Sequence, residues 1–297
     1  MTTHTNTTAA QATAARPAPH GGARTWFVTG ATSGIGLALA RAAAERGDNV
    51  AAIARRTDAL KSLTDAYGPR VLALSADVRS PEDLEAAVAA TVRVFGRIDV
   101  VANNAGYGLF GAVEESTDAQ ARDIFDTNVF GVLNVLRATL PTLRAQGSGH
   151  VLQGSSYYGQ TAHPGVGLLA ATKYAVEGLT DALTDEVASL GIKVTIIEPG
   201  PTATAFLSNL DVASTLPDYD PTVRAVQQSI GELPESAFNS PDRVAAAILT
   251  AVDADQPPLR LATGTTAVTE IRAALKARLA ELDAWEAVSA AVDTPTD

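Results

Sequence analysis

Apolar residues along this chain alternate between short continuous runs and longer helical segments. The segments 34–47 and 80–96 are predicted helices, and Ser80 followed by Pro81 is a typical helix start. Near-continuous apolar runs are typical of strands buried on both faces of a parallel sheet. The alternation predicts βαβ units, and therefore an α/β fold with a doubly wound parallel sheet of Rossmann type. The predicted strands are 25–30, 49–54, 70–76, 98–103, 150–156, 193–199 and 258–263.

The pattern divides the chain into one domain with two flanking segments. Residues 1–23, rich in Thr and Ala, are predicted to form a disordered leader, and 24–265 a single domain. Within it, about 203–240 mixes polar residues, prolines and short helical pieces, which predicts a small helical substrate lid. Residues 266–297 are predicted to form an amphipathic helix packed on the domain, followed by a tail. The apolar lid residues favour an apolar or amphipathic small molecule, or else pack on the core: Phe206, Leu207, Leu210, Leu216 and Tyr219.

Composition narrows the class of function. The chain has 297 residues, 46% of them hydrophobic, and a net charge of −11, which argues against binding nucleic acid or an anionic membrane surface. No run of about 18 apolar residues predicts a membrane span. The absence of cysteine excludes thiolate chemistry and disulfides and fits the cytoplasm, which we expect as the location. The four histidines show no metal-ligand spacing, so no metal is expected.

A glycine-rich turn joins the first predicted strand to the first predicted helix. In the sequence TGATSGIG (29–36), Gly30, Gly34 and Gly36 permit a tight turn that brings the N–H groups of the helix start near a bound pyrophosphate. The position between a clear strand and a clear helix indicates a dinucleotide site, because a glycine-rich turn alone would be weak evidence.

Several further motifs resemble the short-chain dehydrogenase/reductase family over roughly residues 24–265. They are NNAG (103–106), ADV (76–78), TNVFG (127–131), GSS (154–156), ATK (171–173) and PGPTAT (199–204). The resemblance implies a nicotinamide dinucleotide cofactor and a homodimer or homotetramer acting on a small-molecule substrate. The implied cofactor-binding residues are Gly30, Thr32, Ser33, Gly34, Ile35, Gly36, Arg55, Asp77, Val78, Asn104, Ala105, Gly106, Lys173, Pro199, Gly200, Thr202 and Thr204.

The charge after the second predicted strand favours NADP(H) over NAD(H). An NAD site would place a carboxylate there to accept from the ribose 2′-hydroxyl. This chain has Ala54 at that position, followed by Arg55. A guanidinium is a multidentate donor suited to a 2′-phosphate, although Arg55 and Arg56 could instead be solvated loop charges.

The family resemblance also implies a catalytic set with one departure. Similar enzymes use Asn, Ser, Tyr and Lys, the tyrosine exchanging a proton with the substrate oxygen. Asn128, Ser156 and Lys173 match, but Leu169 stands where the resemblance implies the tyrosine. An aliphatic side chain cannot donate a proton, and loss of a general acid commonly lowers the rate by about 10²–10⁴-fold.

Other side chains near the serine motif could act as the acid. Tyr157, Tyr158 and His163 lie in the following segment, whereas Tyr174 should point about 100° away from Lys173 on the same helix. Gly154 lies inside a predicted strand, where glycine is unfavourable. Either Gly154 and Leu169 together enlarge an apolar pocket, or the glycine relieves packing.

Three functions remain open from the sequence. The first is an NADP(H)-dependent oxidoreductase that acts on a small apolar carbonyl, enone or imine with atypical acid chemistry. The second is a non-redox enzyme, such as a cyclase or isomerase, with a structural cofactor. The third is an inactive or inactivated cofactor-binding protein.

Overall fold

The computed structural model describes residues 22–206 and 209–293, so nearly all of the expected leader and Leu207 lie outside the described residues. Its main element is a seven-stranded sheet in the order β3-β2-β1-β4-β6-β7-β9, and every described pairing in it is parallel. The seven strands confirm the predicted ones within a few residues. They are β1 Thr25–Thr29, β2 Asn49–Ala54, β3 Val71–Ser75, β4 Val100–Asn103, β6 Gly149–Gly154, β7 Ile192–Pro199 and β9 Arg260–Thr263.

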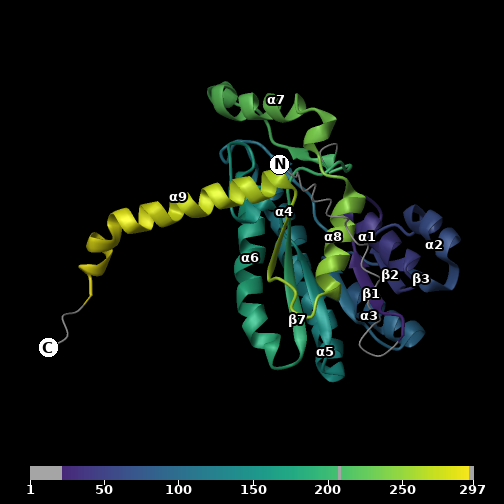
Figure 1. Cartoon of the computed structure of the whole chain (residues 1–297). Coiled ribbons are helices and arrows are strands. Elements are labelled where there is room, and N and C mark those ends of the chain that lie inside the picture. The colour runs from purple at the N-terminus through teal and green to yellow at the C-terminus, as the bar shows by residue number, and fades with distance from the viewer. Residues whose placement is uncertain (1–21, 207–208, 294–297) are drawn as a thin grey trace, which may run out of the picture.

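Helices cover both faces of this sheet, as the predicted doubly wound fold requires (Figure 1). Successive side chains of β1 point to opposite faces of the sheet. Trp26 and Phe27 are therefore both fully buried but belong to different apolar clusters. The Trp26 cluster includes α1 Gly34–Glu45, α2 Lys61–Tyr67 and α8 Pro241–Asp253. The Phe27 cluster includes α3 Pro81–Phe95, α5 Gly131–Gln146 and α6 Gly167–Ala188.

Helix ends follow the local sequence. The Ser80 hydroxyl accepts a hydrogen bond of 3.2 Å from the backbone N–H of Asp83 at the start of α3, which confirms the predicted helix start. Helix α4, Asp118–Phe125, begins with a reciprocal capping box between Thr117 and Gln120. A π-helical turn, Asp126–Phe130, then joins α4 to α5. Such turns often occur at functional sites.

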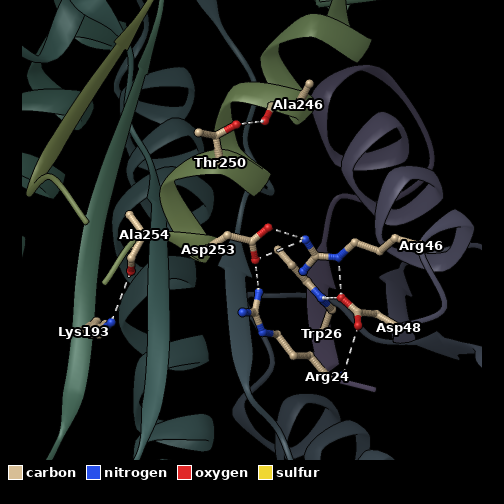
Figure 2. Close-up of polar contacts among 9 residues, drawn as sticks. All are labelled: Arg24, Trp26, Arg46, Asp48, Lys193, Ala246, Thr250, Asp253 and Ala254. Carbon is tan, nitrogen blue, oxygen red and sulfur yellow. Dashed lines mark hydrogen bonds and ion pairs between the residues drawn. The ribbon is translucent and has the colours of Figure 1, made fainter. Parts of the chain in front are cut away.

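An ion-pair network ties together the amino ends of β1 and β2 and the end of α8 (Figure 2). Asp48 accepts a hydrogen bond of 2.8 Å from the Trp26 indole and one of 2.7 Å from Arg46. Asp253 forms ion pairs with Arg24 and Arg46. The network therefore holds together the amino ends of these strands. The glycine turn follows the carboxyl end of β1 and so lies at the opposite end of the sheet.

The segment predicted as a lid contains short elements. They are β8 Asp211–Val212 and α7 Ala225–Gly231. Strand β8 pairs in parallel with β5, Leu109–Phe110, a small sheet that the sequence pattern did not predict. Phe206 and Leu210 lie against Gly108, where a Cβ atom would come within 2.4 Å of Leu210. The lid therefore packs on the loop after β4, while its role toward a substrate stays a prediction.

The C-terminal helix differs from expectation. Helix α9, Thr265–Ala290, forms as predicted, but it extends away from the domain (Figure 1). Its apolar face was expected to pack on the domain, yet Ala267 is the one buried residue of this described helix. The helix is about 39 Å long at 1.5 Å per residue, and its start packs beside β9, so most of its length extends past the domain.

Candidate active site

The glycine turn after β1 has the geometry that the sequence predicts. Gly30 and Gly34 have φ angles of 66° and 53°, in the left-handed region that favours glycine. A Cβ atom at Gly36 would lie 2.3 Å from the Gly30 carbonyl oxygen and 2.5 Å from the Asn104 amide nitrogen. A side chain is therefore excluded at Gly36, where the start of α1 packs closely on the Gly30 backbone and the Asn104 amide.

Thr29 connects this turn to the loop after β4. Its hydroxyl oxygen accepts hydrogen bonds of 3.0 Å from the backbone N–H groups of both Asn104 and Ala105. The Asn104 side chain donates back to the Thr29 carbonyl at 3.3 Å. Sequence analysis assigned roles to Asn104 and Ala105 but missed Thr29, although its place directly before Gly30 was a usable signal.

The residues around the start of α1 fit a dinucleotide. The first turn of this described helix carries no acidic residue, and the Ser33 side chain makes no capping bond, so the N–H groups remain available to a phosphate. Thr204 lies against Gly34, since a Cβ atom there would come within 3.0 Å of the Thr204 methyl group. The structure thus brings the predicted pyrophosphate and nicotinamide residues together.

Other predicted cofactor residues lie at or just after the carboxyl ends of the neighbouring strands. Thr202 donates to the Gly200 carbonyl at 2.9 Å just after Pro199, the last residue of β7. Val78 is buried beside α5 and Asn134 donates to its carbonyl at 3.1 Å. In addition, Thr32 and Ile35 are half-buried in and after the glycine turn.

A basic patch lies beyond β2 and β3. Arg55 is exposed directly after β2, and no carboxylate stands at the strand end because Ala54 occupies it. Asp77 is bound by Arg79, whose guanidinium donates hydrogen bonds as short as 2.7 Å. Those hydrogen bonds hold the pKa of Asp77 below its ordinary value, and the charge of Arg55 adds to the effect.

Lys173 and Asn128 lie close together beside Gly106. The Lys173 ammonium donates to the Gly154 carbonyl at 2.8 Å, and Asn128 exchanges hydrogen bonds of 3.1 and 2.9 Å with the backbone of Tyr107. A Cβ atom at Gly106 would lie 2.9 Å from the Asn128 side-chain oxygen and 3.9 Å from the Lys173 nitrogen. Burial lowers the pKa of Lys173 to about 8, so its ammonium group loses a proton near neutral pH more readily than an ordinary lysine does.

Thr172 is a buried residue of this site that sequence analysis missed. Its hydroxyl accepts a 3.2 Å hydrogen bond from Asn128 and donates a 2.7 Å bond to the Leu169 carbonyl. The π-helical turn that carries Asn128 is thereby fixed to α6 next to Lys173. The signal was the motif ATK itself, in which the threonine directly precedes the lysine.

Leu169 lies one helical turn before Lys173 and is 3% exposed. It packs in an apolar cluster to which α4, the segment around β5 and the predicted lid all contribute side chains. Because this cluster offers hydrocarbon rather than a polar partner, Leu169 is well accommodated where it stands. The cluster contains Leu109, Phe110, Ala112, Ile124, Val166, Leu169 and Val223, with Tyr107, Tyr158, Leu210 and Tyr219 packed against it.

Tyr158 and His163 form a hydrogen-bonded pair beside this cluster. The Tyr158 hydroxyl bonds to Nε2 of His163, and Nδ1 of His163 lies 3.1 Å from the Pro164 carbonyl oxygen. A carbonyl only accepts, so Nδ1 carries a hydrogen, and Nε2 of the neutral ring accepts from Tyr158. Burial raises the pKa of Tyr158 far above its ordinary value, so its hydroxyl stays protonated and gives up its proton less readily than an ordinary phenol does.

The other residues of this loop differ in their bonding. The Ser156 hydroxyl accepts a 3.2 Å bond from the Tyr158 backbone N–H, which leaves its own hydrogen available. The Tyr157 ring stacks on Tyr158 with 4.0 Å between centroids. Tyr174 is 40% exposed and its hydroxyl accepts from Arg278 of α9, as its expected direction away from Lys173 implies.

Gly154 has a packing explanation. A Cβ atom at this position would lie 2.8 Å from the Asn103 carbonyl oxygen and 3.3 Å from the Asn104 Cα. The glycine therefore permits close approach of β6 and β4. This contact favours the packing interpretation over the enlarged pocket.

Two buried carboxyl groups lie behind the loop. Glu177 is 4% exposed and Glu198 is 2% exposed, and the guanidinium nitrogen Nε of Arg260 lies 3.0 Å from the first and 3.9 Å from the second. Burial raises the pKa of Glu198 to about 7, with the charge of Glu177 adding to the effect. The Glu177 carboxylate also lies against Gly159, where a Cβ atom would come within 2.7 Å.

Two kinds of feature are absent from residues 22–206 and 209–293. No helix there combines the length and apolar character that crossing a bilayer requires. Nor do His, Cys, Asp and Glu residues gather there in a group of three or more suited to a metal ion.

Known proteins resemble this chain in sequence and in fold. The family model for short chain dehydrogenases matches residues 24–214. The protein named oxidoreductase BOA17 from Botryotinia fuckeliana is 38% identical over 268 residues, which is 90% of this chain and 98% of that protein. A short-chain dehydrogenase structure from Streptomyces avermitilis has a TM-score of 0.85 and 41% identity, covering 92% of this chain and all of that one.

A further structure carries a nucleotide. The alcohol dehydrogenase of the archaeon Thermococcus sibiricus, complexed with 5-hydroxy-NADP, has a TM-score of 0.67 and 26% identity. The match covers 81% of this chain and 95% of that one. With the glycine turn, the parallel sheet and the matched motifs, these similarities show that the chain belongs to the short-chain dehydrogenase/reductase family of oxidoreductases.

Proposed function

We propose that this protein is an NADP(H)-dependent oxidoreductase that acts on a small apolar carbonyl, enone or imine, with Leu169 in place of the family's tyrosine. The observation that carries the proposal is the contrast within one helical turn of α6. Lys173 is half-buried and donates a hydrogen bond to the Gly154 carbonyl beside Asn128, whereas Leu169 is buried among hydrocarbon side chains. The polar groups expected to serve a nicotinamide ribose are retained, and the change is confined to the proton donor.

Residues around the glycine turn support the cofactor assignment. Gly30, Gly34 and Gly36 would hold the pyrophosphate at the start of α1, and Lys173 would bind the nicotinamide ribose. Arg55 favours the 2′-phosphate of NADP(H), because its exposed guanidinium directly follows Ala54, the position at which an NAD site would carry an acid. Similar structures include complexes with NAD and with 5-hydroxy-NADP, so the proposed preference for NADP(H) rests on Arg55.

The Tyr158–His163 pair is the best-placed substitute for the missing acid. When bound, the nicotinamide would supply or accept the hydride. When His163 is protonated, Nε2–H donates to the Tyr158 oxygen and leaves the Tyr158 O–H free to point toward a substrate oxygen or nitrogen. Tyr158 then gives up its proton and regains one from His163, while Ser156 donates to the same substrate atom.

The apolar cluster around Leu169 supports the substrate class. Aliphatic and aromatic side chains from the loop after β4, from α4 and from the lid meet there. An imine that is already protonated needs less help from an acid than a ketone does, so such a substrate tolerates a leucine at 169. The small-molecule pocket that the lid would complete is therefore expected to be apolar with few polar groups.

Absorbance of NADPH tests the proposal directly. The purified protein is mixed with NADPH and, in turn, with cyclic imines, enones and apolar ketones. Consumption of NADPH with a product reduced by two electrons would support the proposal. A product at the oxidation level of its substrate would instead identify an isomerase or cyclase, and tight NADPH binding without any turnover would identify a cofactor-binding protein.

A further inference from the structure

Helix α9 carries large apolar side chains that the rest of the described chain does not cover. Leu275, Leu279, Leu282 and Trp285 are between 50% and 62% exposed. Figure 1 shows the helix leaving the domain and continuing as a free rod. Four such neighbours on one helix are more than the isolated apolar residues normal on a protein surface, and a contiguous patch of this kind marks an interaction site.

Three of these side chains, Leu275, Leu282 and Trp285, have the spacing of a coiled coil, and Leu279 lies at the position beside the seam. Counting in sevens from Val268, the first position of each heptad is Val268, Leu275 and Leu282, with Ser289 next. The fourth position is Ile271, Arg278, Trp285 and Val292. A repeat of about 3.5 residues keeps an apolar seam facing a second helix, whereas the opposite side of α9 is alanine-rich and carries no large apolar side chain.

The charges along α9 identify the second helix. Residues 268–279 contain three basic residues and one acidic residue, whereas 280–293 contain four acidic residues and no basic one. An antiparallel copy of the same helix would set the basic half of each against the acidic half of the other. A parallel copy would set Arg278 against its own counterpart and Glu281 near Glu286, which are like-charge contacts.

We propose that two copies of this protein associate through α9, paired antiparallel about a two-fold axis near residue 280. In this register Val268 packs on Val292 of the second copy, and Leu275 packs on its Trp285. Arg272 lies across the seam from Glu286 of the second copy, and Arg278 lies near its Glu281. Each ion pair occurs twice, because the contact is isologous.

The contacts of α9 with its own domain agree with this arrangement. The basic half is anchored, since Arg278 donates hydrogen bonds to the Gln160 carbonyl and the Tyr174 hydroxyl. A surface hollow beside it is lined by Ala262, Val268, Ile271, Arg272, Leu275 and Lys276. Antiparallel pairing places the free, acidic half of one copy, with its Trp285, along this hollow of the other.

Light scattering on the full-length protein tests the interface. A variant with Leu275→Glu and Leu282→Glu is compared with a matched control, Ala277→Glu and Ala284→Glu, which adds the same charges to the opposite exposed face. The core variant should halve the mass of the assembly, or weaken association by at least about tenfold, while the control keeps the wild-type mass. Circular dichroism checks that both variants keep α9 helical. A monomeric wild type, or an unchanged mass in the core variant, would overturn the proposal.

A charge exchange tests the antiparallel register. Arg272→Glu alone should weaken association, because it places two carboxylates together at both ends of the seam. Adding Glu286→Arg to the same chain should restore wild-type association, since each new charge again meets its opposite. The two positions lie 14 residues apart in the sequence, about 21 Å along one helix, so no contact within a chain can explain the rescue. Failure of the double variant to regain association would rule out this pairing.

Discussion

The hydroxyl of Tyr158 and the imidazole of His163 are hydrogen-bonded to each other in the loop that follows Ser156. Tyr158 also packs against the apolar cluster that encloses Leu169. The side chain that carries this hydroxyl thus packs on the same apolar cluster as Leu169, which stands where the family resemblance implies a tyrosine. Tyr158 is therefore the candidate for the proton donor that a leucine at position 169 cannot be.

Replacing Leu169 with tyrosine should add the donor that the resemblance implies. Lys173, one turn further along α6, has a pKa lowered to about 8 and can assist a phenol there. We expect Leu169→Tyr to increase kcat/KM for apolar ketones by about 10-fold or more, with a smaller change for imines. Steady-state NADPH oxidation measures both. Leu169→Phe is the control of similar size without a hydroxyl, and an equal gain with that variant would show that shape rather than acidity was responsible.

Arg55 should discriminate between the two nicotinamide cofactors. Removing a guanidinium that binds a 2′-phosphate commonly costs about 1.5–3 kcal/mol, so Arg55→Ala should raise the Kd for NADPH by roughly 10- to 100-fold and leave the Kd for NADH nearly unchanged. Fluorescence titration with each nucleotide measures this difference. Arg56→Ala, the exposed neighbour, is the matched control. Equal weakening for both nucleotides would contradict the NADP(H) assignment.

Glu198 should make the stability of the protein depend on pH. Its pKa in the folded protein is raised to about 7 from an ordinary value of 4.5. The folded protein is therefore most stable below about pH 4.5, where the carboxyl is neutral in both states, and it loses stability as the pH rises through 7. Glu198→Gln should therefore increase the free energy of unfolding by about 1–3 kcal/mol near pH 8 and by little near pH 5.

Urea unfolding at the two pH values checks this prediction. Glu186→Gln, an exposed change on α6, serves as control and should leave the curves unchanged. If the Gln variant at 198 were less stable than the wild type near pH 8, the carboxylate would have to be a favourable partner of Arg260 instead.

Asp253 should contribute more to stability than its neighbour on the same helix. Both Asp253 and Asp242 join α8 to the start of the domain, but Asp253 pairs with the buried Arg24, while Asp242 pairs with the exposed Arg41. Asp253→Ala removes a carboxylate partner from the buried Arg24, while Arg46 keeps its second partner, Asp48. The change should cost about 3 kcal/mol, against about 0.5 kcal/mol or less for Asp242→Ala. Equal losses in urea unfolding would show that the network of Figure 2 acts as a surface feature.

The sheet and the glycine turn could be predicted because their signals are local. Continuous apolar runs identify each strand, and Gly30 and Gly34 identify a backbone conformation that other residues avoid. The pairing of β5 with β8 could not be predicted, because two residues on each side carry no period, and segments about 100 positions apart must meet. Exposure of α9 was missed for a related reason, since an amphipathic pattern does not show which surface will cover it.

The candidate site shows the same division. Motifs located Asn128, Ser156 and Lys173, but the hydrogen bond from Asn128 to Thr172 depends on how the π-helical turn meets α6. The Tyr158–His163 pair likewise depends on a loop conformation that no sequence period encodes. The contact of Gly154 with the neighbouring strand, which favours the packing interpretation, likewise depends on how β6 and β4 pair.

Kinetics of two adjacent tyrosine variants test whether Tyr158 is the proton donor. Tyr158→Phe removes the hydroxyl that bonds to His163, while Tyr157→Phe removes a hydroxyl from the ring stacked on it. With an imine or enone that the wild type reduces, we predict that Tyr158→Phe lowers kcat by about 10²–10⁴-fold at unchanged NADPH affinity, and that Tyr157→Phe stays within about threefold. A Tyr158→Phe enzyme as active as the wild type would contradict the assignment of the acid to Tyr158.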